Sequence, residues 1–125
     1  MKENIILQKT ISFALKVIDY AEVLQENKKY VIANQLLKSG TSVGANVHEA
    51  QNAESKNDFI HKFKIAAKEV EETKYWLTLC KESAHYPDCE RLEHDLFEIE
   101  KIITAIISTT KNKINKKEPA TNQLT

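Results

Sequence analysis

The chain has 125 residues, of which 42% are hydrophobic and 29% are charged, a composition typical of one globular domain and not of a disordered chain. It contains only two glycines and two prolines, which argues against a turn-rich β-sheet protein and favours helices with short connections. Lysine plus arginine equals aspartate plus glutamate, 18 each, so the zero net charge argues against a protein whose whole surface binds polyanions.

The first predicted helix spans residues 4–26 and carries two apolar lines. One line steps by three and four residues and is the expected core stripe: Leu7, Ile11, Ala14, Ile18 and Ala21. The other holds larger side chains: Ile6, Phe13, Val17, Tyr20 and Leu24. A helix of a single bundle buries one stripe, so the second line predicts an exposed surface that docks onto another copy of the chain. The interface candidates on this helix are therefore Phe13, Val17, Tyr20 and Leu24.

The second predicted helix, residues 29–54, contains both glycines of the chain, Gly40 and Gly44, four positions apart on one face. Each glycine inside a helix costs about 1 kcal/mol relative to alanine, so we expect a compensating close approach of another helix. Ser39 and Asn46 lie near them on the expected core stripe, and Asn46 is the candidate for a buried residue that sets helix register. A phosphate-binding loop is excluded because no strand precedes these glycines.

The third and fourth predicted helices complete an up-down-up-down antiparallel four-helix bundle, an all-α fold. Ser55 and Asp58 form a start signal for the third helix, and Pro87 is expected at the first position of the fourth. The expected core stripes are Phe59, Phe63, Ala66, Val70, Thr73, Leu77 and Cys80, then Leu92, Leu96, Ile99, Ile103 and Ile106. Further interface candidates lie off the third stripe: Ile65, Tyr75, Trp76 and Leu79. Residues 1–115 form the expected bundle, and residues 116–125 are expected to be a disordered tail.

Charge is predicted to separate along the bundle. Residues 1–13, 43–68 and 103–125 share one end and carry formal charges of +1, +1 and +3, whereas residues 14–42 and 69–102 carry +1 and −6. The lysine-rich end is a candidate site for polyanions such as RNA or DNA, because clustered cations hold phosphates. Its candidate residues are Lys56, Lys62, Lys64, Lys68, Lys111 and Lys113. Solvated lysines without a ligand are the alternative interpretation.

Residue patterns that specify an enzyme are not found. A di-iron bundle needs two Glu-x-x-His motifs, and the chain has one, from Glu82 to His85. We therefore expect no metal, no cofactor and no catalytic residue. Cys80 and Cys89 flank a predicted turn and are expected to be free thiols, as in cytoplasmic proteins. The expected location is the cytoplasm, because the N-terminal sequence lacks a signal peptide and no segment is apolar enough to span a membrane.

Helices two and three carry a resemblance to a known family. Residues 35–50, QLLKSGTSVGANVHEA, and residues 58–66 and 68–77, DFIHKFKIA and KEVEETKYWL, resemble the signature of the bacterial four-helix-bundle family encoded in intervening sequences of 23S rRNA genes. A similar fold is found in the accessory protein of diversity-generating retroelements, which binds nucleic acid and a reverse transcriptase. The resemblance implies a ring-shaped homopentamer without enzymatic activity. The retroelement relatives are strongly basic, whereas this chain is neutral.

The sequence thus predicts a non-enzymatic homo-oligomer that works as a binding or scaffold protein, with another macromolecule, such as a protein, as its partner. The alternative is a nucleic-acid-binding accessory protein that uses the lysine-rich end. The two hypotheses differ in their dependence on salt, because phosphate binding weakens steeply as salt rises.

Overall fold

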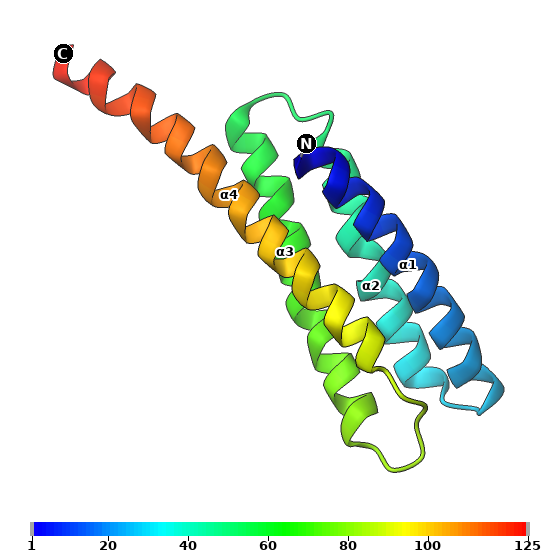
Figure 1. The fold of residues 1–125 in the computed structure, drawn as a ribbon. Helices are drawn as coiled ribbons and strands as arrows, with labels where there is room; N and C mark the ends of the chain where they lie inside the picture. The colour runs from blue at the N-terminus through cyan, green and yellow to red at the C-terminus, as the bar shows by residue number, and fades with distance from the viewer. Residues whose placement is uncertain (1, 125) are drawn as a thin grey trace.

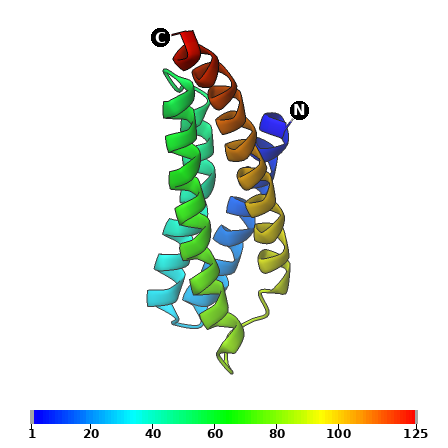
Figure 2. The ribbon, with the colours of Figure 1, turned by 90° about the vertical axis from the view of Figure 1, so that its left-hand side faces the viewer.

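The computed structural model describes the backbone of residues 2–124 and the side chains of residues 5–116. Four helices follow one another: α1 (Lys2–Glu26), α2 (Tyr30–Ala50), α3 (Lys56–Glu82) and α4 (Glu90–Leu124). Each helix packs on the next, and α4 returns to pack on α1. The result is an antiparallel four-helix bundle in which α1 and α3 lie diagonally opposite (Figures 1 and 2). The predicted fold class is confirmed.

The core confirms the predicted stripes of α3 and α4 almost completely. Every predicted core residue of these two helices is buried except Phe59, which is half-buried and stacks against Phe63 with 4.7 Å between ring centroids. On each of these helices one stripe of regular spacing holds most of the apolar side chains, and that stripe faces the core.

The first helix is different, because the structure buries the other line. Its buried residues are Ile6, Thr10, Phe13, Val17, Ala21 and Leu24. Of the predicted core stripe only Ala21 is buried, while Ile11 is 49% exposed. Both lines have helical spacing, so periodicity alone does not choose between them; the line with the larger side chains fills the bundle.

Short connections join the helices at alternate ends. Ser55 caps α3, its hydroxyl accepting a hydrogen bond from the Asp58 backbone N–H at 3.0 Å, as the sequence predicts. Pro87 does not begin α4, contrary to the prediction. It lies in the preceding connection, where its carbonyl accepts a 2.6 Å hydrogen bond from the Tyr20 hydroxyl, and α4 begins at Glu90.

The fourth helix is the longest and projects past the other three at its C-terminal end (Figure 1). It continues through Lys116, where the sequence predicts the bundle to end and a tail to begin. The predicted disorder of residues 116–125 stays a prediction. The projecting end of α4 lies at the same end of the bundle as the connection between α2 and α3 (Figures 1 and 2).

Candidate functional site

The two glycines of α2 lie against α1 of the same chain. A Cβ atom built on Gly40 would lie 3.0 Å from both Cγ atoms of Val17, and one built on Gly44 would lie 3.0 Å from Cβ of Thr10. A methyl group at either position would fit only if Val17 or Thr10 moved away by a few tenths of an ångström. Close approach therefore occurs between α1 and α2 inside the bundle, where Val17 and Thr10 occupy the recesses that the glycines leave.

Buried polar groups in this region are satisfied by hydrogen bonds. Ser39 and Thr73 are both fully buried, and their hydroxyls lie 3.0 Å apart between α2 and α3. The Thr10 hydroxyl donates to the carbonyl of Ile6 at 2.9 Å, within its own helix. Asn46 does not set helix register, contrary to the prediction. It is half-buried, and its amide donates to the Ser42 carbonyl at 2.8 Å, so the hydroxyl pair is the polar contact between α2 and α3 in the core.

Three of the interface candidates on α1 are core residues. Phe13, Val17 and Leu24 are at most 1% exposed within one chain, so they are not available for docking and the prediction for them is wrong. The physical reason is the recess at the two glycines, which accepts the side of α1 that bears Val17. Tyr20 is half-buried, with its hydroxyl turned to the connection before α4.

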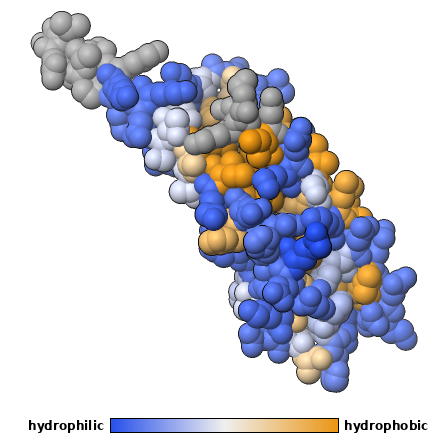
Figure 3. All heavy atoms as spheres, in the orientation of Figure 1, coloured by the Kyte–Doolittle hydropathy of each residue, from blue (hydrophilic) through white to orange (hydrophobic). Residues whose placement is uncertain are grey.

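Three residues of the expected core stripe of α1, together with Leu15, which belongs to neither predicted line, instead form a partly exposed apolar surface, which we call the α1 stripe. It comprises Leu7, Ile11, Leu15 and Ile18, of which Leu15 is 58% exposed. Figure 3 shows apolar side chains along the margin of the molecule where α1 lies in Figure 1. Helical spacing places these four residues on one face, adjacent to the face that packs in the core.

A second apolar surface lies on α3 and is made of the remaining interface candidates; we call it the α3 surface. Its members are Ile65, Tyr75, Trp76 and Leu79, of which Tyr75 is 57% exposed and the others are half-buried. The Trp76 indole N–H donates to Glu72 at 3.4 Å, and the Tyr75 and Trp76 rings meet edge to face with centroids 5.1 Å apart. Both contacts are made within α3.

Of the predicted polyanion residues, the structure separates one from the rest. Lys62 is half-buried and pairs with Glu49 at 3.5 Å. The other candidates are exposed, and within the described residues none of them lies within ion-pairing distance of a carboxylate: Lys56, Lys64, Lys68, Lys111 and Lys113. Lys56 and Lys64 lie in the first turns of α3, Lys68 lies near its middle, and Lys111 and Lys113 lie toward the projecting end of α4. The start of α3 and the projecting end of α4 belong to the same end of the bundle (Figure 1).

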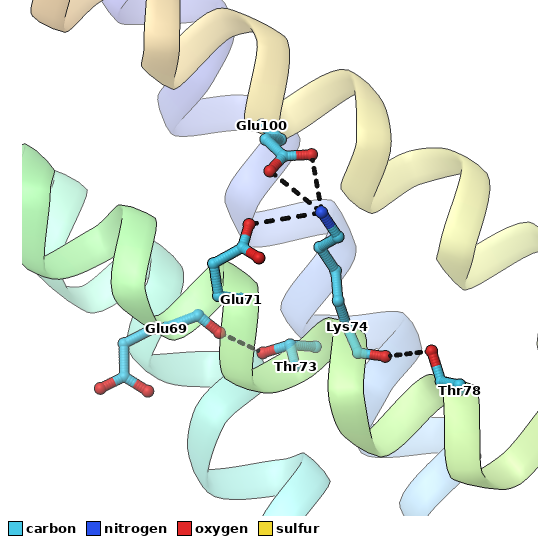
Figure 4. A network of polar contacts seen from close by, with 6 residues as sticks. All are labelled: Glu69, Glu71, Thr73, Lys74, Thr78 and Glu100. Atoms are coloured by element: carbon cyan, nitrogen blue, oxygen red, sulfur yellow. Dashed lines mark hydrogen bonds and ion pairs between the residues drawn. The ribbon is translucent and has the colours of Figure 1, made fainter.

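A polar network that sequence reasoning missed joins α3 to α4. The Lys74 ammonium lies 3.2 Å from Glu100 and 3.3 Å from Glu71 (Figure 4). Hydrogen bonding to Glu100, then to Glu71, raises the pKa of Lys74. The side chains of Glu100 and then Lys74 lower the pKa of Glu71. Because Lys74 and Glu100 are 26 positions apart on different helices, no local spacing could have revealed their contact.

The two cysteines are buried, free thiols near Tyr20. Burial, followed by nearby carboxylates, raises the pKa of Cys89 to about 11, and burial raises the pKa of Cys80 as well. Both thiols therefore stay protonated near neutral pH, the form that is a poor nucleophile. The Cys89 thiol lies 3.5 Å from the Leu77 carbonyl, which it donates to. Cys80 and Cys89 both lie in the core, beside the connection between α3 and α4.

Across the described side chains, no three histidine, cysteine or acidic residues gather as metal ligands would. No helix in the described part of the chain is both long and apolar enough to cross a membrane.

Comparison with known proteins gives a family and a structural relative. Residues 2–105 match the model of the 23S rRNA-intervening sequence protein family. A crystal structure of a protein of unknown function from the S23 ribosomal protein family of Bacteroides thetaiotaomicron is 40% identical, with a TM-score of 0.81. The match covers 86% of this chain and 99% of that one. No curated protein matches. With the four-helix architecture and the matched residues spanning α1 to α3 and half of α4, the chain belongs to the family of 23S rRNA-intervening sequence proteins.

Proposed function

We propose that the protein is a non-enzymatic homo-oligomer that acts as a binding or scaffold protein, and that its copies dock through the α1 stripe and the α3 surface. The observation that carries the proposal is the exposure of large apolar side chains on helices that already bury a full core stripe. Ile11 and Leu15 on α1 and Tyr75 on α3 are each about half exposed to solvent. Contiguous apolar surface of this kind marks association sites in globular proteins.

The placement of the two surfaces favours a ring over a two-fold dimer. They lie on different helices, α1 and α3, which are diagonal in the bundle. A contact that joins one surface to a different surface of the next copy is heterologous, and it closes into a ring when the rotation between copies allows. The homopentamer implied by the family resemblance is such a ring. Zero net charge adds no long-range repulsion between copies.

The test is the mass of the protein in solution, with charges introduced into the α1 stripe. Light scattering coupled to size exclusion is expected to show an oligomer for the wild type and monomer for the variant that combines Ile11→Glu with Leu15→Glu, because assembly would bury two unpaired carboxylates. The matched control combines Gln8→Glu with Ser12→Glu, which adds the same charge at the same spacing on exposed positions of α1. The control is expected to stay oligomeric.

Circular dichroism of all three proteins shows whether the bundle remains folded, which separates lost assembly from lost structure. A wild-type protein that is monomeric at high micromolar concentration contradicts the proposal. So does a double variant that keeps the wild-type mass.

A second candidate function is polyanion binding at the lysine-rich end. It is supported by the exposed lysines of α3 and α4 that have no carboxylate partner among the described residues. RNA or DNA is expected to bind there with an affinity that falls steeply as salt rises. Fluorescence anisotropy with generic RNA and DNA measures this, and Lys64→Glu combined with Lys68→Glu is expected to abolish it.

The control for this experiment combines Lys28→Glu with Lys81→Glu, which makes the same change in net charge on exposed lysines at the other end of the bundle. Binding that survives the Lys64 and Lys68 substitutions, that ignores salt, or that is lost equally in the control would remove this candidate.

A further inference from the structure

A pocket lies between α1 and the first turn of α4. Its apolar part is formed by Tyr20 and Val23 from α1 and by Cys89 and Leu92 at the start of α4. Val23 is 40% exposed and Tyr20 is half-buried, so solvent reaches this apolar surface. The pocket has a volume of about 300 Å³, at the lower end of the ~300–1,000 Å³ that is typical of small-molecule sites. Its size therefore suits a small ligand and not a folded partner.

The connection before α4 forms one wall of this pocket. The Tyr20 hydroxyl donates to the Pro87 carbonyl at 2.6 Å, which ties the connection to α1. The Cys89 thiol donates to the Leu77 carbonyl at 3.5 Å. Because these polar groups are satisfied within the chain, the apolar part of the pocket offers a ligand nonpolar contact alone.

Charged side chains on both helices complete the pocket, and they differ in whether the chain itself satisfies them. The Lys16 ammonium lies 2.6 Å from Asp95. Asp88 accepts a backbone N–H at the start of α4 at 3.3 Å. Asp19 and Arg91 are exposed, and among the described residues neither has an oppositely charged group within ion-pairing distance.

The two unpaired groups have opposite charges and come from different helices. Asp19 lies on α1 and Arg91 on α4, and although they line the same pocket they do not pair with each other. A ligand with one positive and one negative group can meet both of them. A simple anion would satisfy Arg91 but would be repelled by Asp19 and Asp88, and a simple cation would leave the guanidinium unpaired. The pocket therefore favours a zwitterion that also carries an apolar group.

We propose that this pocket binds a free amino acid with a branched apolar side chain, such as leucine. The guanidinium of Arg91 would hold the ligand carboxylate, because it can donate two parallel hydrogen bonds to it. Asp19 would meet the ligand ammonium, and the apolar side chain would lie on Val23 and Leu92. The proposal goes beyond self-association, and the pocket shares no residue with the α1 stripe or the α3 surface.

Equilibrium dialysis with radiolabelled L-leucine measures the binding, and unlabelled compounds that each lack one feature of leucine compete for the site. Isocaproate lacks the ammonium group, isoamylamine lacks the carboxylate and glycine lacks the apolar side chain. The wild-type protein is expected to bind leucine saturably, and each of the three compounds is expected to compete at least tenfold more weakly than unlabelled leucine. Competition by isocaproate or isoamylamine that equals that of leucine would mean apolar binding without charge recognition and would overturn the proposal.

Protein variants locate the binding. Asp19→Asn and Arg91→Gln are each expected to weaken leucine binding at least tenfold. Arg91→Gln is also expected to bind leucine and isoamylamine equally, because the variant no longer recognises the carboxylate by which they differ. A variant that is merely damaged would not show this loss of discrimination.

The controls are Glu54→Gln and Lys56→Gln, which neutralise exposed charges outside the pocket and are expected to bind leucine as the wild type does. Circular dichroism verifies that each variant is folded. Leucine binding that Asp19→Asn and Arg91→Gln leave unchanged, or that the controls weaken equally, would overturn the proposal.

Two results with the unmodified pocket would also overturn it. One is the absence of saturable leucine binding to the wild type. The other is binding that occurs only in the variant that combines Ile11→Glu with Leu15→Glu, which would mean that a second copy covers the pocket in the assembled protein. Light scattering on the Asp19 and Arg91 variants reports assembly separately, so the failure of either proposal is visible without the other.

Discussion

At the scale of single residues, Gly40 and Gly44 determine how α1 meets α2. They lack the two methyl groups that would push Val17 and Thr10 away, because atoms of these side chains lie 3.0 Å from where each Cβ would be. The sequence alone predicts that these glycines permit a close approach, because their cost in a helix requires compensation. It does not reveal which helix approaches. Thr10 is polar, so the sequence does not suggest that it is a core residue. In the structure its hydroxyl donates a hydrogen bond to the Ile6 carbonyl, which allows it to be buried.

Replacement of Gly44 by a large residue tests this contact. Gly44→Leu is expected to destabilise the fold by ~1–3 kcal/mol or more, because the leucine side chain has no space beside Thr10. Urea unfolding followed by circular dichroism, at one fixed protein concentration, gives the free energy of unfolding. Ala45→Leu, at the next and exposed position, is the control and is expected to change stability little. Equal stabilities of the two variants would show that the contact is not close.

The pair of Ser39 and Thr73 shows another limit of residue-level prediction. Both residues were expected in the core, and both are fully buried. Their mutual hydrogen bond at 3.0 Å depends on the rotation of α2 against α3, which spacing within one helix does not fix. Asn46 was the more obvious candidate from its residue type, yet its side chain is satisfied by its own helix at Ser42. Local hydrogen bonding of this kind is common for asparagine.

At the scale of helices and turns, the end of α1 shows how tightly the first connection is made. The Lys29 backbone N–H donates to the Leu24 carbonyl at 2.8 Å, and that of Lys28 donates to Gln25 at 2.9 Å. This is the Schellman pattern of a helix C-terminus. It requires a left-handed residue, and Lys28 has a φ of 62°, the only positive φ of a non-glycine residue in the described chain.

A glycine at this position is expected to stabilise the protein. Lys28→Gly should raise the free energy of unfolding by ~1 kcal/mol, because glycine adopts the left-handed conformation without the contact between Cβ and the backbone that lysine makes. Thermal and urea unfolding measure the gain. The neighbouring Asn27→Gly is the control: it introduces the same residue and removes the 2.9 Å hydrogen bond from Asn27 to the Val23 carbonyl, so a loss is expected. A loss in both variants would argue against conformational strain at Lys28.

The rotation of α1 about its own axis is the feature of the helix packing that the sequence does not predict. The helices, their order, the cap at Ser55 and the core stripes of α3 and α4 could all be predicted from spacing and capping chemistry. The rotation of α1 could not, because both of its apolar lines have helical spacing. The glycine recess of α2 decides the rotation, and that is a contact between residues more than 20 positions apart. The surface left outside is Ile11 and Leu15 instead of Phe13 and Val17.

At the scale of the whole molecule, the net charge is zero, but positive and negative side chains are concentrated at opposite ends of the bundle. The antiparallel arrangement brings lysines of α3 and α4 to the end where α4 projects, and carboxylates such as Glu93 and Glu100 to the other half. The sequence predicts this separation because only the order of the helices is needed. The pocket between α1 and α4 could not be predicted, since its residues come from two helices and their rotation decides which of them meet.

The last described turns of α4 stand clear of the other three helices (Figure 1). In a closed ring whose subunits all point the same way, every copy would place this overhang around the same opening. That rim would be edged with ammonium groups, among them Lys111 and Lys113, while the opposite rim would bear an excess of acidic side chains. A charged polymer passing through such a ring would meet two openings of opposite charge. The sign of its own charge would therefore decide which opening it enters first.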